Sequence, residues 1–289
     1  KRPNMASLSR ITCHAVHGMT PQAREGLARE LFAVHAQIFS GLEFESFRDY
    51  VVERPSFRTW IYVKHNAAGS LVGYTSMHAF HLRIAGRAST VIRLEAGTLR
   101  AARGRDLTMV YAVMRLLRLW ASEPWRRFCI FAALTHPSSY TFLSHYAPVI
   151  YPHAKRDIPA GVMQRMEELA SHFELERIDP ENPLLRRVDW VTLESPEERT
   201  RWHTSRRADT RFYIAHNPGY ESGHGLLTYI PFNGVILLRS LGRFLVCRAG
   251  RIARLVFGEQ RNSATRPCAP VKPVTRPGAE WAHTRPPSL

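Results

Sequence analysis

The sequence predicts a mixed α/β fold in which helices flank a mostly antiparallel sheet, with a helical extension at the C-terminus. Three observations support this prediction. Residues 9–17 alternate as a strand does and are followed by an amphipathic helix at 21–39. The apolar runs 57–65 and 71–84 flank the turn NAAGS, which is typical of an antiparallel hairpin. An apolar strand at 88–99 then leads through an Arg/Gly-rich turn into a long apolar helix.

Two helices precede the hairpin. Thr20 and Pro21 supply an N-cap and a first-turn proline for helix 21–39, whose leucine and isoleucine side chains recur at three and four positions. A second, shorter helix at 45–53 ends before Pro55, because the residue preceding a proline is disfavoured in the helical region.

Helices and strands also alternate after the central strand. Helix 107–121 carries an apolar stripe on one face, and 127–134 is a buried strand. Residues 138–147 predict a helix, and 148–152 begin the last core strand. An amphipathic helix follows at 159–173.

The region after this helix is less regular. Residues 180–201 are polar and contain proline, which predicts a loop with a short strand at 190–193. Residues 211–232 predict a strand, a glycine turn and a second apolar run.

Composition limits the classes of function. With 289 residues the chain is long enough for one or two domains, and its 40 Lys and Arg against 24 Asp and Glu give a formal net charge of +16. This excess favours an anionic partner. Because the basic residues are scattered and lack a recognised module, nucleic acid is not expected as that partner. The four widely spaced cysteines indicate reduced thiols in a cytoplasmic protein, and the pattern predicts no membrane-spanning helix.

The stretch 91–121 is suited to holding an anion. Three arginines, Arg100, Arg103 and Arg105, lie in the turn between the central strand and the helix, and Gly104 frees its backbone. A helix N-terminus has backbone N–H groups without partners and a partial positive charge, so this turn is suited to a diphosphate.

Here the chain resembles the GNAT superfamily of acyl-CoA-dependent N-acetyltransferases. In that family the central strand is followed by Arg/Gln-x-x-Gly-x-Gly/Ala, whose amides hold the pyrophosphate of coenzyme A. The matching residues are Arg103-Gly104-Arg105-Asp106-Leu107-Thr108, although Asp106 and Thr108 replace the two glycines. The resemblance covers about residues 9–152 and implies acetyl-CoA or a longer acyl-CoA as co-substrate and an amine acceptor. It also implies that strand 127–134 lies parallel to the central strand and splays away from it. No metal is expected, because His78 and His81 lie three apart on a presumed strand and so face opposite sides.

The resemblance also implies the catalytic groups. Glu95 on the central strand is the candidate base for the acceptor amine, and an ion pair with a neighbouring arginine is the alternative reading. The backbone at Thr98 and Leu99 would hold the pantetheine. Tyr146 is the candidate acid for the departing thiolate, with Tyr140 and Tyr151 as competitors.

The segment 235–257 predicts an amphipathic basic helix. Leucine, isoleucine and phenylalanine occupy one side of it, and Arg239, Arg243, Arg251 and Arg254 occupy the other. Two readings stay open, namely a helix that lies on an anionic membrane surface and a helix that packs on the core with a solvated basic face.

The predicted organisation has four parts. Residues 1–152 form the GNAT-like core, and 153–232 complete the sheet and the acceptor side. The basic helix occupies 233–258, and 259–289 form a Pro-rich disordered tail. The leading hypothesis is an acyl-CoA-dependent N-acyltransferase that transfers the acyl group directly in a ternary complex. The alternative is a catalytically inactive GNAT-fold binding protein, peripheral at the inner face of the membrane.

Overall fold

The computed structural model describes residues 10–103, 108–188 and 190–258. It consists of two compact units that divide between Leu245 and Val246. The predicted boundaries at 152 and 232 therefore fall inside the first unit, and the predicted disordered tail at 259–289 lies outside the described residues.

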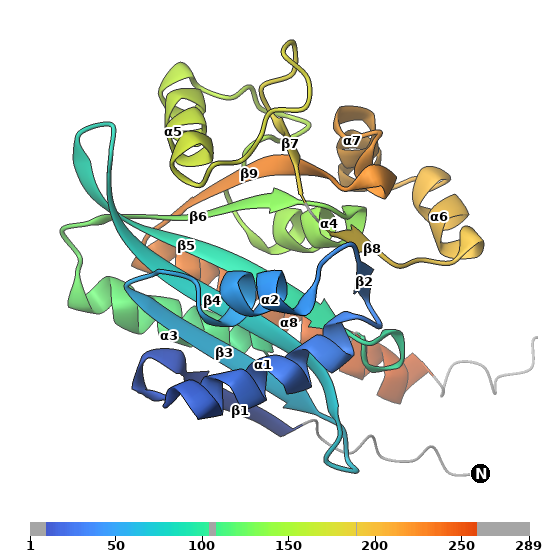
Figure 1. Cartoon of the computed structure of the whole chain (residues 1–289). Coiled ribbons are helices and arrows are strands. Elements are labelled where there is room, and N and C mark those ends of the chain that lie inside the picture. Colours follow the sequence, from blue (N-terminus) through green and yellow to red (C-terminus); the bar gives the residue numbers. More distant parts are fainter. Residues whose placement is uncertain (1–9, 104–107, 189, 259–289) are drawn as a thin grey trace, which may run out of the picture. The chain divides into compact units, whose positions relative to one another are not determined.

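A seven-stranded sheet forms the centre of the first unit (Figure 1). Its strand order is β1-β3-β4-β5-β6-β9-β7, and β2 and β8 form a separate two-stranded sheet. All neighbours in the large sheet pair antiparallel except β5 and β6, which run parallel. This confirms the mixed, mostly antiparallel sheet expected from the sequence. The strands are β1 (Arg10–Ala15), β2 (Phe39–Ser40), β3 (Arg58–His65), β4 (Leu71–Ile84), β5 (Arg87–Thr98), β6 (Arg127–Leu134), β7 (Leu185–Arg187), β8 (Val191–Thr192) and β9 (His224–Phe232).

Helices cover both faces of the sheet (Figure 1). α3 and the first part of α8 pack on one face through a core that includes Leu116 and Leu237, whereas α1 and α2 pack on the other through Leu31 and Phe47. The helices are α1 (Pro21–His35), α2 (Phe44–Phe47), α3 (Thr108–Ser122), α4 (Pro137–Tyr146), α5 (Ala160–His172), α6 (Pro196–His203), α7 (Ala208–His216) and α8 (Gly234–Gly258), with a π-helical turn η2 (Arg48–Val52) and 3-10 turns η1 (Val16–Gly18), η3 (Arg100–Ala102) and η4 (Tyr220–Ser222).

The two parallel strands diverge along their length. Their register runs from Ser89 opposite Arg127 to Ile92 opposite Ile130, where the pairing ends. β5 nevertheless continues to Thr98, and β6 continues to Leu134 while paired with β9 on its other edge. The parallel strand that splays from the central strand is therefore confirmed.

Two predicted strands are wrong. Residues 148–152 form only a single bridge, between Tyr151 and Tyr229, and β9 occupies the place in the sheet beside β6. The first half of 211–232 belongs to the helix α7, in which Thr210 and Tyr213 are fully buried three residues apart. A short apolar run of this kind does not distinguish a strand from a buried helix by periodicity.

The N-terminal helices also differ in detail from the prediction. α1 ends at His35 because the chain then turns into β2, where Ile38 accepts a hydrogen bond from Leu193 and Phe39 pairs with Thr192. The predicted helix 45–53 is a short α-helix that continues as the π-helical turn η2.

The first part of α8 packs on the core of the first unit. Leu237 and Phe244 are buried, whereas Arg239 and Arg243 are exposed. Up to Leu245 the helix therefore packs on the core and exposes its basic face, which is the second of the two interpretations left open by the sequence. None of the helices within the described ranges is long and apolar enough to cross a membrane.

Substitution of Leu227 tests the place of β9 in the core. Leu227 is fully buried against Ala133 of β6, so Leu227→Ala should lower the free energy of unfolding by about 2–5 kcal/mol. The matched change Leu238→Ala removes the same atoms from an exposed side chain and should change it by about 0.5 kcal/mol or less. Urea unfolding followed by circular dichroism measures both, and equal effects would contradict this assignment.

Candidate functional site

A small cavity lies where β5 and β6 diverge. Its volume is about 90 Å³, and the diverging strands supply Arg93 to Glu95 and Ala132 to Leu134. The segment after residue 153 closes it with residues that lie far from the two strands in sequence. The remaining lining residues are Leu42, Tyr50, Leu175, Arg187, Val188 and Trp190.

A buried cluster of charges lies at this cavity, which Arg93 and Glu95 line and beside which Arg54 lies. The carboxylate of Glu95 lies 3.9 Å from Nε of Arg93 and 3.8 Å from Nη1 of Arg54, and the side chains of all three are nearly inaccessible to solvent. Arg93 donates through Nη2 to the hydroxyl of Tyr50 (2.7 Å). The guanidinium of Arg93 lies over the ring of Phe173, 4.7 Å from its centre. The sequence analysis identified Glu95 and an arginine neighbour, but it missed Arg54, Tyr50 and Phe173.

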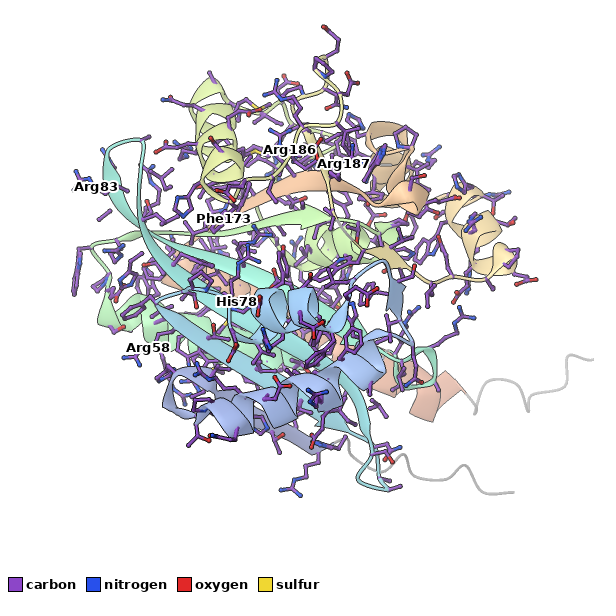
Figure 2. All side chains as sticks on the ribbon, viewed as in Figure 1. Arg58, His78, Arg83, Phe173, Arg186 and Arg187 are labelled. Atoms are coloured by element: carbon purple, nitrogen blue, oxygen red, sulfur yellow. The ribbon has the colours of Figure 1, made fainter. Side chains whose placement is uncertain are left out.

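His78 connects Glu95 to a chain of hydroxyl groups. Its Nε2 lies 3.2 Å from Oε2 of Glu95 and 3.1 Å from Oγ of Ser76. Because the hydrogen of Ser76 is donated to the carbonyl of Val51, Nε2 carries a hydrogen. In neutral His78, Nδ1 then accepts from Thr59, which lies 2.8 Å away. His78 lies on β4 and is labelled in Figure 2.

Glu95 is ionised at neutral pH. Burial by itself would raise the pKa of this carboxyl, but His78, Arg93 and Arg54 together outweigh it and hold the pKa below its ordinary value of 4.5. Burial, with the charge of Glu95 as a second cause, raises the pKa of Tyr74 well above 10.0. The site thus contains a buried carboxylate rather than a neutral acid.

The arginines that follow β5 contact an acidic side chain from α6. Glu198 forms ion pairs with Arg100 and Arg103, and Arg201 lies 3.8 Å from the same carboxylate. Arg103 also donates through Nε to the carbonyl of Thr98 (3.2 Å). Glu198 itself belongs to a capping box with Ser195. The other predicted residues of the turn, Gly104, Arg105, Asp106 and Leu107, lie outside the described residues, and Thr108 begins α3.

Thr98 and Leu99 direct their backbone groups to different edges of β5. The N–H of Leu99 donates to Val72 in β4 (2.9 Å), so it has no free hydrogen for a pantetheine. Thr98 has its carbonyl on the other edge, where Arg103 reaches it. Thr98 therefore stays a prediction for the pantetheine contact, and Leu99 could serve only through other atoms.

The structure does not bring Tyr146 to the cavity beside Glu95. Its ring packs against Phe142, His145 and Phe244 at the end of α4. The competing Tyr140 is buried and donates its hydroxyl hydrogen to the carbonyl of Pro152 (2.9 Å). Burial raises the pKa of Tyr140, which makes it a weaker acid. The role of Tyr146 stays a prediction.

His136 forms a buried pair at the C-terminal end of β6. Its Nε2 lies 3.3 Å from Oε2 of Glu194, and its Nδ1 accepts from the backbone N–H of Ser138 as the N-cap of α4. Burial opposes the charge of Glu194, but His136, Tyr220 and Arg199 together lower its pKa. The sequence analysis missed Glu194, because the two partners lie 58 residues apart and no local pattern connects them.

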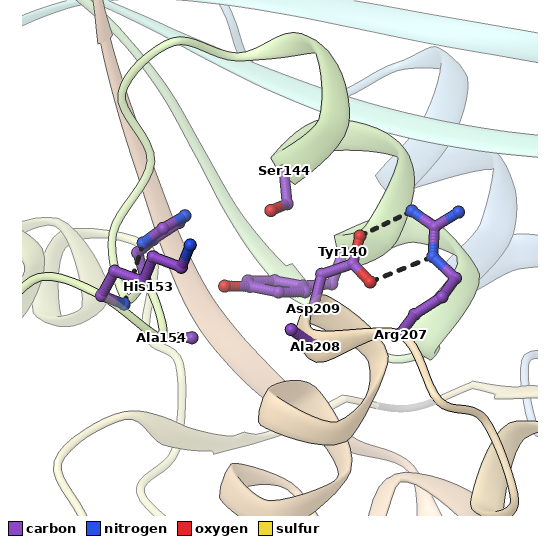
Figure 3. A pocket seen from close by; sticks show the side chains of 8 residues that line it. Tyr140, Ser144, His153, Ala154, Arg207, Ala208 and Asp209 are labelled. Atoms are coloured by element: carbon purple, nitrogen blue, oxygen red, sulfur yellow. Dashed lines mark hydrogen bonds and ion pairs between the residues drawn. The ribbon is translucent and has the colours of Figure 1, made fainter.

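A second, more open cavity lies between α4, the loop at 153–155 and the start of α7 (Figure 3). Its volume is about 320 Å³, and Arg207 and Asp209 at its rim form two hydrogen bonds with each other, of 3.1 and 2.7 Å. Because its charged lining residues are exposed or only partly buried, unlike Glu95, we do not place the site there.

The histidines do not gather into a metal site in the part of the chain that the structure describes. No group of three His, Cys, Asp or Glu side chains there could hold a metal ion. His78 and His81 point to opposite sides of β4, as predicted, since His78 contacts Glu95 and His81 lies 3.0 Å from Glu123.

The order of elements identifies the fold. Two helices, an antiparallel hairpin, the central strand, the arginine turn, a helix and a splayed parallel strand follow one another as in the GNAT acyltransferases. The chain has a GNAT-like fold. No protein-family model and no curated protein sequence matches it.

Solved structures to which this GNAT-like chain is similar include three transferases. A probable N-acyltransferase from Enterococcus faecalis is 10% identical, with a TM-score of 0.31; the match covers 48% of this chain and 32% of that one. A GNAT acetyltransferase from Streptococcus pneumoniae is 11% identical over 52% and 92% of the chains, with a TM-score of 0.33. A spermidine N-acetyltransferase from Vibrio cholerae is 11% identical over 50% and 81%, with a TM-score of 0.32. The chain thus spans about a third of the first of these proteins.

Replacing Glu95 by Gln should leave two buried guanidinium groups without their counter-charge. The free energy of unfolding at neutral pH should fall by about 3–5 kcal/mol. Because the pKa of Glu95 is lowered by folding, its contribution is complete above pH 4.5 and is lost as the pH falls through the lowered pKa. Urea unfolding from pH 7 to pH 3 should therefore show a flatter pH dependence for Glu95→Gln than for the parent protein.

Glu176→Gln is the matched control for this substitution. Glu176 is exposed and pairs with the exposed Arg187, so its loss should cost about 1 kcal/mol or less. Equal losses in the two variants would refute the buried ion cluster.

Proposed function

We propose that this protein is an acyl-CoA-dependent N-acyltransferase that transfers an acetyl or longer acyl group directly to an amine. The observation that supports this proposal is the cavity between the splayed strands β5 and β6, which contains the ionised carboxylate of Glu95. The opening lies on the same strand that ends in the arginine turn, so one strand can serve both the acyl donor and the acceptor.

In this proposal the acyl donor lies along the free edge of β5. Arg100 and Arg103 hold the diphosphate, together with the turn that leads into α3. The edge of β5 at Thr98 offers backbone groups to the pantetheine. Glu198 pairs with both arginines in this structure, so the diphosphate must displace its carboxylate from them.

The chemistry needs a proton acceptor for the amine and a proton donor for the thiolate. Glu95 is ionised and takes the proton as the nitrogen attacks the thioester carbonyl, and His78 contacts the same carboxylate. A C–N bond forms and the C–S bond breaks. Tyr146 is proposed to give its hydroxyl proton to the departing thiolate, which requires α4 to present it differently from the packing seen here.

Calorimetric titration with acetyl-CoA tests the donor site. Arg103→Glu places a negative charge at the diphosphate, so binding should weaken at least tenfold. Arg118→Glu makes the same change at an exposed position of α3 and should leave the affinity within about twofold. An unchanged affinity of Arg103→Glu, or the absence of heat with the parent protein at millimolar acetyl-CoA, would refute the proposal.

Glu198→Gln should change the affinity for acetyl-CoA in the opposite direction. Glutamine preserves the capping box of α6 but removes the carboxylate that competes for the two arginines. Acetyl-CoA should bind this variant more tightly than the parent protein. Weaker binding would mean that the arginines do not receive the diphosphate.

A second candidate function is that of a GNAT-fold binding protein at an anionic membrane surface. The exposed side of α8 favours it, because Val235, Leu238 and Leu245 are exposed beside Arg239 and Arg243. Exposed apolar side chains flanked by arginines are typical of helices that lie at a lipid interface.

Sedimentation with vesicles tests this candidate. Each basic residue near an anionic surface contributes about 1 kcal/mol, so Arg239→Glu with Arg243→Glu should weaken binding to phosphatidylglycerol vesicles at least about tenfold. Neutral phosphatidylcholine vesicles should bind little. The double change Arg83→Glu with Arg87→Glu, at the exposed turn between β4 and β5, is the charge-matched control. An equal loss in both double variants would show only the effect of net charge.

A further inference from the structure

The ion cluster at the cavity contains unsatisfied guanidinium donors; Arg93 and Glu95 line the cavity, and Arg54 lies beside Glu95. Nε and Nη1 of Arg93 and Nη1 of Arg54 are buried without a hydrogen-bond partner among the described residues. Oε2 of Glu95 is also buried, with Nε2 of His78 3.2 Å away. Buried polar groups in native proteins are nearly always hydrogen-bonded, so this concentration points to a ligand.

The charges of this cluster do not cancel. Arg93 and Arg54 carry two positive charges against the single negative charge of Glu95, at distances of 3.8 and 3.9 Å that are too long for direct hydrogen bonds. A buried guanidinium without a partner is costly, and its planar fork of donors matches a carboxylate. The excess of one buried positive charge therefore favours an acceptor that brings a carboxylate of its own.

We propose that the acceptor of the acyl group is an amine that bears a free carboxylate beside the amino group, as an apolar α-amino acid does. Its carboxylate receives hydrogen bonds from Arg93 and Arg54, and its amino group lies at the carboxylate of Glu95. The side chain of the acceptor contacts the apolar lining, which includes Leu42, Leu175 and Trp190. This inference rests on the proposed acyltransferase function and names its substrate class.

The same geometry predicts which amines are excluded. An amino-acid amide or a simple alkylamine keeps the amino group but leaves the two guanidiniums unpaired. A site built to hydrogen-bond a substrate group discriminates strongly against analogues that lack it. The N-terminal residue of a peptide is excluded for the same reason, because its carboxyl group is an amide.

The test compares three probes of similar shape, L-leucine, L-leucinamide and isopentylamine, with the full chain and saturating coenzyme A. Calorimetry should show binding of L-leucine at least tenfold tighter than of the other two. Thiol release from acetyl-CoA should show the same preference in kcat/KM. Parallel measurements with L-phenylalanine and L-phenylalaninamide cover a larger side chain.

Substitution of Arg93 makes the test specific. Arg93→Gln should reduce the preference for the free acid over the amide to about threefold or less, while acetyl-CoA binding stays unchanged. Arg93→Lys keeps the charge and should retain part of the preference for the free acid. This variant can be measured if Arg93→Gln does not fold. Arg83→Gln, at an exposed turn, is the control and should keep the full preference.

The outcomes separate the two proposals. Equal use or binding of acid, amide and amine by the parent protein would refute the carboxylate site and leave the acyltransferase function standing. Binding of the free acids without thiol release would support the carboxylate site and count against the acyltransferase. If neither of the two free acids binds, the carboxylate site is refuted.

Discussion

The end of the pairing between β5 and β6 at Ile92 and Ile130 is the constraint on which the site depends. Two neighbouring strands that stop exchanging hydrogen bonds must satisfy their backbone groups elsewhere. β6 does so through its antiparallel pairing with β9, whereas β5 keeps β4 on one edge and leaves the other open. The cavity is therefore a consequence of sheet topology, and the strand that completes the sheet comes from the region beyond residue 153.

Buried charges distinguish this opening from an apolar cavity. Burying the ion cluster of Arg54, Arg93 and Glu95 costs desolvation free energy. The attraction across its long contacts offsets only part of that cost. Aromatic rings support the arginines, since Arg54 lies 4.1 Å over Tyr50 and Arg93 lies 4.7 Å over Phe173. For stability alone, apolar side chains in place of these three charged residues would serve at least as well. The retained charges are explained if a ligand completes their hydrogen bonds.

Much of the fold could be predicted from the sequence, because its local signals agree with the final structure. The strand predicted at 127–134 has the bounds of β6, and Thr20 caps α1 as expected. Gly97 in the predicted central strand allows a close approach, since a Cβ there would lie 3.1 Å from Ile38 and Phe39. Short apolar runs such as 211–216 show neither helical nor strand periodicity clearly. There tertiary burial decided the structure, and the predicted strand was wrong.

The candidate site could be predicted only in part, because its members come from segments that are distant in sequence. Glu95 was found as a charge within an apolar strand, but Arg54 precedes the hairpin and Trp190 follows the core. Trp190 reaches the cavity only because the β2–β8 pairing brings 190–193 back beside 38–40. The segment beyond 153 therefore lines the cavity as well as contributing strands to the sheet. Since Glu198 of the same segment pairs with the arginines that follow β5, this segment contacts both the cavity and the basic turn at the end of β5.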